Sequence, residues 1–251
     1  KWMETLEASG IRKFFGLSKQ MKNPVDLSLG QAHCDVPLPV KEAMTRAVQE
    51  GKNGYTVTTG VPGLQRAVAA SLKNEGLEPE SLLVTAGAEG GLVLSLLALA
   101  DDSCEVLVPD PYFATYNHVV RLCGARPRWI DTYPDFRLTP EKLKAAYTDK
   151  CRILLFNSPV NPTGVAYTNK EIQALAACCK QLGLQVISDE VYERCCYDRP
   201  HASWMEYDPD CVLVRAFSKS LGMAGWRVGF AAGPKAIIGP MTMLQQFTFI
   251  C

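Results

Sequence analysis

Short apolar runs alternate with helical patterns along most of this chain. Seven runs rich in apolar residues predict strands: Leu82–Thr85, Glu105–Val108, Arg128–Ile130, Ile153–Asn157, Gln185–Ser188, Val212–Ala216 and Val228–Ala231. Several of them are almost continuously apolar, which is typical of strands that are covered on both faces. Because strands that alternate with helices favour parallel pairing, we expect an α/β fold with a mostly parallel sheet wrapped by helices.

Three segments between the runs carry distinct helix signals. In Gly63–Asn74 the apolar residues recur with the 3.6-residue period of a helix that buries one face. Thr168–Leu182 begins with a threonine and has Glu171 three residues on, which is the pattern of a capping box. Thr139–Tyr147 has Pro140 in its first turn, where a missing N–H costs least. All three segments are therefore expected to be helices.

The most apolar stretch, Leu82–Ala100, is long enough to raise the question of a membrane span. Glu89 and a group of small residues around Gly87 interrupt it. A buried strand, a glycine-containing turn and a buried helix explain the stretch better, so we expect no contact with a membrane. Charged and polar residues recur through Lys1–Lys22, which is not the pattern of a signal peptide.

The two ends of the sequence differ from its middle. Residues 1–35 do not follow the alternation of strands and helices, although Glu4–Gly10 is helical in pattern, and we interpret them as an N-terminal arm or part of a second domain. Pro240–Ile250 has the pattern of a helix that stops at Cys251 without a cap. We therefore expect the sequence to be truncated at this end.

Composition excludes several classes of protein. Lysine and arginine together number 26, as do aspartate and glutamate, so no net charge attracts nucleic acid or an anionic membrane. The 10 cysteines include two adjacent pairs but no C-x2-C pair of the zinc-binding kind, and we expect no metal site. We interpret them as free thiols in a reducing compartment, which favours a cytoplasmic protein.

Ligands of open α/β sheets bind at the carboxyl ends of the strands, so the residues that follow each predicted strand are candidates for a site. The turn Gly87-Ala88-Glu89 follows the first strand and opens a helix, where its N–H groups can hold a phosphate. Arg227 lies between two nearby glycines and offers a planar fork that suits phosphate. A tight turn explains the first of these features equally well.

Other strand ends carry residues that suit a planar ring. Phe113 can stack on such a ring, and Asn161, fixed in a stiff Asn-Pro turn, can donate a hydrogen bond to a phenolic oxygen. Asp189 ends a buried strand and needs a partner such as a protonated pyridine nitrogen, while Tyr192 can reach the same ring. Lys219 follows another strand, where desolvation lowers a lysine pKa and leaves a nucleophilic amine. Taken singly, each residue also fits a core aromatic, a turn, a helix cap or a solvated lysine.

Taken together and in this order, the residues resemble the class I/II aminotransferases, which have the aspartate aminotransferase fold (fold type I) of pyridoxal-phosphate enzymes. The motifs that carry the resemblance lie between Gly30 and Pro234: Tyr55 with Gly60 and Gly63, Gly87, Tyr112-Phe113, Asn157–Gly164, Asp189-Glu190-x-Tyr192, and Ser218-Lys219 with Gly225-x-Arg227-x-Gly229. The resemblance implies a three-layer α/β/α sandwich around a mixed seven-stranded sheet. Residues 36–251 would form the large, cofactor-binding domain, residues 1–35 an arm or part of the small domain, and the small C-terminal domain would be absent.

The resemblance also implies roles for the catalytic and ring-binding residues. Lys219 would hold pyridoxal 5'-phosphate as a Schiff base and would act with Asp189 and Tyr192 in catalysis. Asp189 would pair with the pyridine nitrogen, and Tyr192 and Asn161 would donate hydrogen bonds to the phenolic oxygen. Phe113 would stack on the face of the ring.

The same resemblance implies a phosphate site and a substrate site. The phosphate would be held by Gly87, Ala88, Glu89, Ser218 and Arg227. Tyr55 of a neighbouring subunit would reach the same phosphate, so the active form would be a homodimer. Gly30 and Asn161 would contact the substrate, an amino acid or a 2-oxo acid.

The implied activity is the transfer of an amino group between an L-amino acid and a 2-oxo acid. Other enzymes of the same fold (a C–S β-lyase, a decarboxylase-like member or a cyclopropane-forming synthase) share the cofactor motifs. A non-catalytic cofactor-binding regulator and a truncated inactive product are further alternatives.

The sequence departs from the family in two ways that bear on function. Glu89 stands where the family often has a residue friendlier to phosphate, and its carboxylate would repel the anion unless it pointed away. The arginine that binds the substrate carboxylate belongs to the small C-terminal domain.

Overall fold

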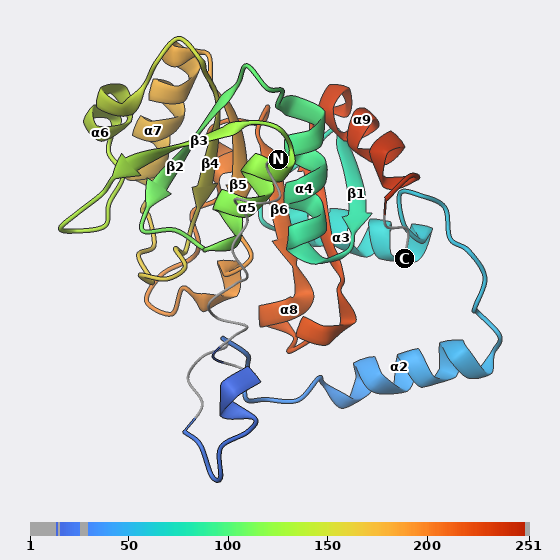
Figure 1. Cartoon of the computed structure of the whole chain (residues 1–251). Coiled ribbons are helices and arrows are strands. Elements are labelled where there is room, and N and C mark those ends of the chain that lie inside the picture. The colour runs from blue at the N-terminus through green and yellow to red at the C-terminus, as the bar shows by residue number, and fades with distance from the viewer. Residues whose placement is uncertain (1–13, 15, 26–29, 249–251) are drawn as a thin grey trace.

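The computed structural model describes residues 14, 16–25 and 30–248. One sheet of seven strands crosses the molecule in the order β1-β7-β6-β5-β4-β2-β3 (Figure 1). The strands are β1 Ser81–Thr85, β2 Glu105–Asp110, β3 Arg126–Asp131, β4 Cys151–Asn157, β5 Gln185–Asp189, β6 Val212–Ala216 and β7 Gly229–Gly233. The predicted α/β fold with a mostly parallel, seven-stranded sheet is confirmed.

Strand β7 is the exception to parallel pairing. It lies between β1 and β6 and is antiparallel to both, with Ala231 opposite Leu83 on one side and Val214 on the other. The neighbouring pairs among β2 to β6 are all parallel. The carboxyl ends of β1 to β6 therefore share one edge of the sheet with the amino end of β7.

Helices cover both faces of the sheet. Their bounds are α2 Leu38–Gln49, α3 Pro62–Asn74, α4 Gly87–Leu99, α5 Thr115–Leu122, α6 Pro140–Ala146, α7 Asn169–Leu182, α8 Phe217–Ser220 and α9 Lys235–Gln245. One apolar cluster joins the sheet to α3, α6 and α7, and a second joins it to α4, α5 and α9. The result is the expected sandwich of three layers, while α2 extends away from the sheet (Figure 1).

The helix signals in the sequence have structural counterparts. Thr168 and Glu171 form both halves of the capping box at the start of α7, which ends at Gly183 in the left-handed region. At α6 the side chain of Thr139 accepts a hydrogen bond from the N–H of Lys142. The apolar stretch predicted as strand, turn and helix is β1 followed by α4.

Several predicted strands differ from the observed ones by one or two residues at an end, and two of the differences in predicted elements have identifiable reasons. The strand predicted from Val228 begins at Gly229, because Gly229 pairs with Ala216, the last residue of β6, and α8 begins at Phe217. The helix predicted as Pro240–Ile250 is α9, which begins five residues earlier and ends at Gln245 with Pro240 in its interior. The helical pattern at Glu4–Gly10 lies outside the described residues.

The structure also bears on cysteines, metals and membranes. The cysteines that it describes are all free. Within the described ranges, no group of three or more His, Cys, Asp or Glu residues could hold a metal ion. No helix in this part of the chain is both long and apolar enough to cross a bilayer.

Candidate active site

The predicted site residues gather at the edge where β1 to β6 end and β7 begins. The turn Gly87-Ala88-Glu89 follows β1, and Lys219 lies on α8 directly after β6. Arg227 comes two residues before β7. Parallel strands thus bring to one edge residues that are far apart in the sequence.

Lys219 lies beside the N-terminal segment and an aromatic ring. Its Nζ donates a hydrogen bond to the carbonyl oxygen of Gly30 at 2.5 Å and lies 5.7 Å from the centre of the Tyr192 ring. Burial lowers the pKa of Lys219, and the positive charge of Arg227 acts in the same direction, while Cys195 opposes them. The amine is therefore easier to deprotonate than an exposed lysine, which suits a nucleophile.

Asp189 places a carboxylate almost out of contact with water, since only 3% of the residue is exposed. Its Oδ2 accepts a hydrogen bond from the hydroxyl of Tyr116 at 2.7 Å, and its Oδ1 accepts one from the N–H of Val191 at 3.2 Å. Burial raises the pKa of Asp189 to about 6, although these two hydrogen bonds oppose the rise. A cation beside this group would favour the carboxylate form.

Two asparagines join the end of β4 to the end of β5. The Nδ2 of Asn157 donates to the carbonyl oxygen of Asp189 at 2.8 Å, and its Oδ1 accepts from the N–H of Asn161 at 2.8 Å. The Nδ2 of Asn161 then donates to the hydroxyl of Tyr192 at 3.4 Å. This series of contacts fixes Asn161 and Tyr192 relative to the buried carboxylate.

The turn at the start of α4 packs against Arg227. Gly87 has a φ of +70°, and a Cβ added to it would lie 2.8 Å from Nη2 of Arg227, so only glycine fits there. The same Nη2 donates to Oε2 of Glu89 at 2.9 Å, and Nη1 donates to the carbonyl oxygen of Ala224 at 3.2 Å. The Glu89 side chain thus points toward the predicted phosphate site rather than away from it. Ala86, the residue before α4, has a methyl side chain that cannot cap the first turn.

The two adjacent aromatic residues after β2, Tyr112 and Phe113, contact different partners. Tyr112 stacks on Trp129, with ring centres 4.2 Å apart and planes 3° from parallel. Phe113 meets Tyr116 edge to face at 5.6 Å. Phe113, rather than Tyr112, therefore lies beside the hydrogen-bond partner of Asp189.

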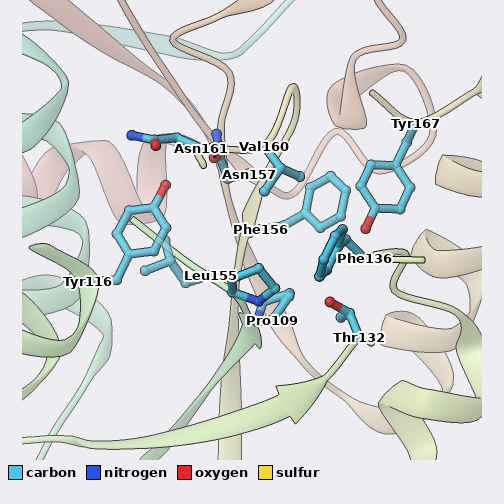
Figure 2. A pocket seen from close by; sticks show the side chains of 11 residues that line it. Pro109, Tyr116, Thr132, Phe136, Leu155, Phe156, Asn157, Val160, Asn161 and Tyr167 are labelled. Carbon is cyan, nitrogen blue, oxygen red and sulfur yellow. Dashed lines mark hydrogen bonds between the residues drawn. The ribbon is translucent and has the colours of Figure 1, made fainter. Parts of the chain in front are cut away.

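A small cavity of about 20 Å³ lies behind this group of residues, between the carboxyl ends of β2 and β4. Figure 2 shows the polar ends of Tyr116 and Asn161 on one side of it and the rings of Phe136 and Tyr167 on the other. This volume is enough for about one water molecule and too small for a pyridine ring.

Tyr55 is the predicted site residue that the structure does not bring to this edge. Its side chain is fully exposed in the loop after α2. None of the described residues of α2 itself is buried. By contrast, Ser218 is mostly buried on α8, next to Lys219.

Sequence reasoning missed the side-chain network behind the site. Oε2 of Glu190 accepts hydrogen bonds from Nη2 of Arg215 and from Nε2 of His201, each at 2.9 Å. Despite burial, Arg215 and His201 lower the pKa of Glu190 to about 2. Nη1 of Arg215 also pairs with Glu75 at 2.7 Å, next to the end of α3. Asn157 was part of a motif and Tyr116 was not, and no spacing rule connected either of them to Asp189.

The residues at this edge fit pyridoxal 5'-phosphate, the cofactor that the sequence resemblance implies. Asp189 is a buried carboxylate that favours a cationic partner, as a protonated pyridine nitrogen would be. Lys219 is an amine with a lowered pKa, which suits attack on an aldehyde. The α4 turn packs so closely on the Arg227 fork that a Cβ at Gly87 would collide with the guanidinium, and the N–H groups of the turn and this fork suit an anion.

Comparison with known proteins supports this assignment. Residues 22–251 match the family model described as aminotransferase class I and II. A probable aspartate aminotransferase of Methanocaldococcus jannaschii is 33% identical over 99% of this chain and 68% of its own length. Aromatic-amino-acid aminotransferase 2 of Thermococcus litoralis is 32% identical over 99% of this chain and 67% of its own length. The solved structure of Thermus thermophilus aspartate aminotransferase with maleate superposes with a TM-score of 0.94 at 32% identity, covering 99% of this chain and 68% of that one.

The match covers nearly all of this chain but only part of each relative. Across the curated relatives compared, the chain spans from 58% to 68% of the relative's own length.

Proposed function

The chain belongs to the class I and II aminotransferase family, and on that premise we propose that the protein transfers an amino group between an L-amino acid and a 2-oxo acid. The family depends on pyridoxal 5'-phosphate, which we propose is bound covalently to Lys219. One observation carries the proposal, a series of contacts that runs from the Lys219 amine over the ring of Tyr192, through Asn161 and Asn157, to the main-chain carbonyl of Asp189.

The cofactor would be held at both of its ends. Asp189 would pair with the ring nitrogen, and the amide of Asn161 and the hydroxyl of Tyr192 would donate hydrogen bonds to the phenolic oxygen. The backbone N–H groups of Gly87, Ala88 and Glu89, with Ser218 and Arg227, would hold the phosphate. Phe113 would pack against the face of the ring. These contacts fix the orientation of the ring, which lowers the entropic barrier to reaction.

Lys219 would move the proton in the reaction. When bound, the cofactor supplies an electron-withdrawing ring that acidifies the Cα–H of the amino acid. Since burial and Arg227 lower the pKa of Lys219, its Nζ is suited to accept this proton and to return it, first as general base and then as general acid. Asp189 would keep the opposite end of the ring positively charged throughout.

Attachment of the cofactor can be tested by mapping it. The chain is incubated with pyridoxal 5'-phosphate, reduced with borohydride, digested and examined by mass spectrometry. We expect the modified peptide to contain Lys219, and Lys219→Ala to lose the modification while Lys180→Ala, a change at an exposed lysine of α7, keeps it. Equal labelling of Lys219→Ala would refute the assignment.

A product assay then distinguishes transamination from elimination by a lyase, because transamination yields a keto acid without ammonia and elimination yields both.

We further propose a homodimer in which Tyr55 serves the site of the neighbouring subunit. Related aspartate aminotransferases are dimers. In this chain Tyr55 is fully exposed, and α2 exposes Leu38, Met44 and Val48 to solvent. Large exposed apolar side chains on an otherwise uncovered helix are typical of a surface that another subunit buries.

Mixed dimers test this arrangement. If Tyr55 acts across the interface, a dimer of one Lys219→Ala and one Tyr55→Ala subunit contains one complete site and one doubly defective site. We expect mixing the two inactive variants to restore up to half of the wild-type activity per dimer. Activity that stays at the level of the separate variants, in mixtures shown by mass spectrometry to contain mixed dimers, would place Tyr55 in its own subunit's site.

A cytoplasmic location is also proposed. The free cysteines of the described residues, several of them buried, support a reducing compartment. Fractionation of cells expressing the protein, with immunodetection in cytoplasmic and membrane fractions, tests it.

A further inference from the structure

The guanidinium of Arg227 already has an anionic partner within the chain. Its Nη2 donates to Oε2 of Glu89 at 2.9 Å, and the two side chains are 46% and 50% exposed. Its Nη1 donates to the carbonyl oxygen of Ala224. Two of its five N–H donors are thus engaged, one on each terminal nitrogen, and a bidentate grip on phosphate would compete with these contacts.

Glu89 also lies at the end of α4 that would bind the phosphate. It stands in the first turn of this helix, where the helix dipole favours negative charge. Burial and the charge of Glu190 raise the pKa of Asp189, and the charge of Glu89 adds a smaller rise. The half-exposed carboxylate of Glu89 and a bound phosphate would therefore share one guanidinium and one helix end.

Resting on the function proposed above, we propose that Glu89 is a displaceable internal anion of the phosphate site: its carboxylate holds Arg227 until the phosphate of the cofactor takes its place. The chain then binds the phosphorylated cofactor less tightly than it would with a neutral residue at position 89. Glu89 becomes a determinant of how readily the cofactor is retained and exchanged.

The expected effect is moderate, because the ion pair is half exposed. Loss of such a pair on cofactor binding, together with the repulsion between a carboxylate and a phosphate about 4 Å or more apart in water, weakens binding about tenfold. Replacement of Glu89 by the isosteric glutamine removes both effects and keeps the backbone N–H that the phosphate would use.

The test measures cofactor affinity of the full chain by equilibrium dialysis, without an activity assay. We expect Glu89→Gln to lower the dissociation constant of pyridoxal 5'-phosphate about tenfold. Binding of pyridoxal, which lacks the phosphate, should change less than twofold. The matched control is Glu78→Gln, which removes the same charge from an exposed ion pair with Lys73. This control should change neither constant by more than twofold.

A second pair of variants tests whether Glu89 acts through Arg227. In an Arg227→Gln background the cofactor binds more weakly, and the additional change Glu89→Gln should improve binding by less than half as much, on a logarithmic scale, as it does in the wild-type chain. An undiminished improvement would show direct repulsion and would overturn the displacement of Glu89 from Arg227. Unchanged or weaker binding by Glu89→Gln alone would overturn the proposal as well.

The outcomes also separate this inference from the function on which it rests. A wild-type chain that forms no adduct at Lys219 contradicts both. An adduct at Lys219 with equal dissociation constants for the wild-type chain and Glu89→Gln contradicts only the role of Glu89.

Discussion

At the scale of single residues, Asp189 shows the cost of preparing a site for a charged partner. Burial raises its pKa from the ordinary value of 3.8 to about 6. Because the folded chain then holds the proton more tightly than the unfolded chain, ionised Asp189 destabilises the fold. The penalty grows as the pH rises from 3.8 to 6 and is constant above that range. The difference between the two values corresponds to about 3 kcal/mol.

We therefore expect Asp189→Asn to stabilise the cofactor-free chain by about 1–3 kcal/mol at pH 8, while transamination is largely lost. The gain should shrink as the pH falls below 6 and should vanish near pH 4. Urea unfolding of the wild-type and variant chains at both pH values measures it. Asp210→Asn, a change at an exposed carboxylate, serves as the control and should shift stability by less than 0.5 kcal/mol at either pH. A gain that persists undiminished at pH 4 would contradict the linkage.

The hydroxyl of Tyr116 stabilises the ionised form of Asp189, because it donates a hydrogen bond to the carboxylate. A hydrogen bond to a charged group contributes about 1.5–3 kcal/mol. Without it the pKa of Asp189 rises further, so the charged form exists only at higher pH. We expect Tyr116→Phe to move the acidic limb of the kcat/KM profile upward by about one pH unit. Tyr112→Phe, whose ring stacks on Trp129, is the control and should leave the profile in place.

The sequence predicted where single residues lie when they directly follow a predicted strand. Lys219 and Asp189 follow buried strands, and a parallel sheet brings such positions to one edge. Tyr116 carried no comparable signal, because its partner lies 73 residues away in the sequence. The contact between Glu89 and Arg227, 138 residues apart, was equally hidden, since no local rule determines where a partly exposed side chain points.

At the scale of elements, the turn between β1 and α4 requires glycine at position 87 for two reasons. Gly87 needs a positive φ, and it leaves space for Arg227. We expect Gly87→Ala to weaken binding of pyridoxal 5'-phosphate more than tenfold and to lower the free energy of unfolding by about 1 kcal/mol. Dialysis and urea unfolding measure the two effects.

A matched control separates strain from the loss of space for Arg227. Gly183 ends α7 with a φ of +66°, and a Cβ there would meet no described atom within 4 Å. Gly183→Ala should therefore cost a similar free energy of unfolding but leave cofactor binding unchanged. Equal cofactor binding by the two variants would show that Gly87 matters only for the shape of the turn.

Elements with local capping signals were predicted more accurately than those without. The capping box placed the start of α7 within a residue, because its hydrogen bonds are made by residues close in sequence. The start of α9 was missed, because Pro240 was interpreted as the first turn of a helix although the first turn follows Pro234. The start of β7 depends on where its partner β6 gives way to α8, at Phe217, and the apolar pattern does not contain this information.

At the scale of the whole molecule, the Glu190–Arg215 network joins segments from separate parts of the chain. Glu190 follows β5, Arg215 lies in β6 and Glu75 ends the α3 region. The side chains of Glu190 and Arg215 are only 1% and 4% exposed. Removal of one partner would leave a buried charge without compensation.

We expect Arg215→Met to lower the free energy of unfolding by about 3–5 kcal/mol. The control, Arg137→Met, breaks the partly exposed pair with Glu171 and should cost less than about 1 kcal/mol. Urea unfolding monitored by tryptophan fluorescence compares them. Similar losses for both variants would mean that the Glu190 network contributes no more than a surface ion pair.

The sequence indicated the layers of the molecule but not the position of its last strand. Alternating strands and helices predicted a mostly parallel sheet, because such units pack in one way. The insertion of β7 between β1 and β6 depends on pairing over long sequence distances. The composition of Gly229–Gly233, which is fully buried, does not reveal which neighbours it will have.

The position of β7 has a consequence for folding of the chain while it is being synthesised on the ribosome. Strand β1 pairs with β7 through Ser81 and Gly233, so β1 lacks this partner until translation has passed residue 233. The turn Gly87-Ala88-Glu89 follows β1 and Arg227 precedes β7, so the two parts of the proposed phosphate site meet only when that late strand is inserted. On the proposed site, a nascent chain would therefore complete its phosphate-binding residues only after the whole sheet has been synthesised.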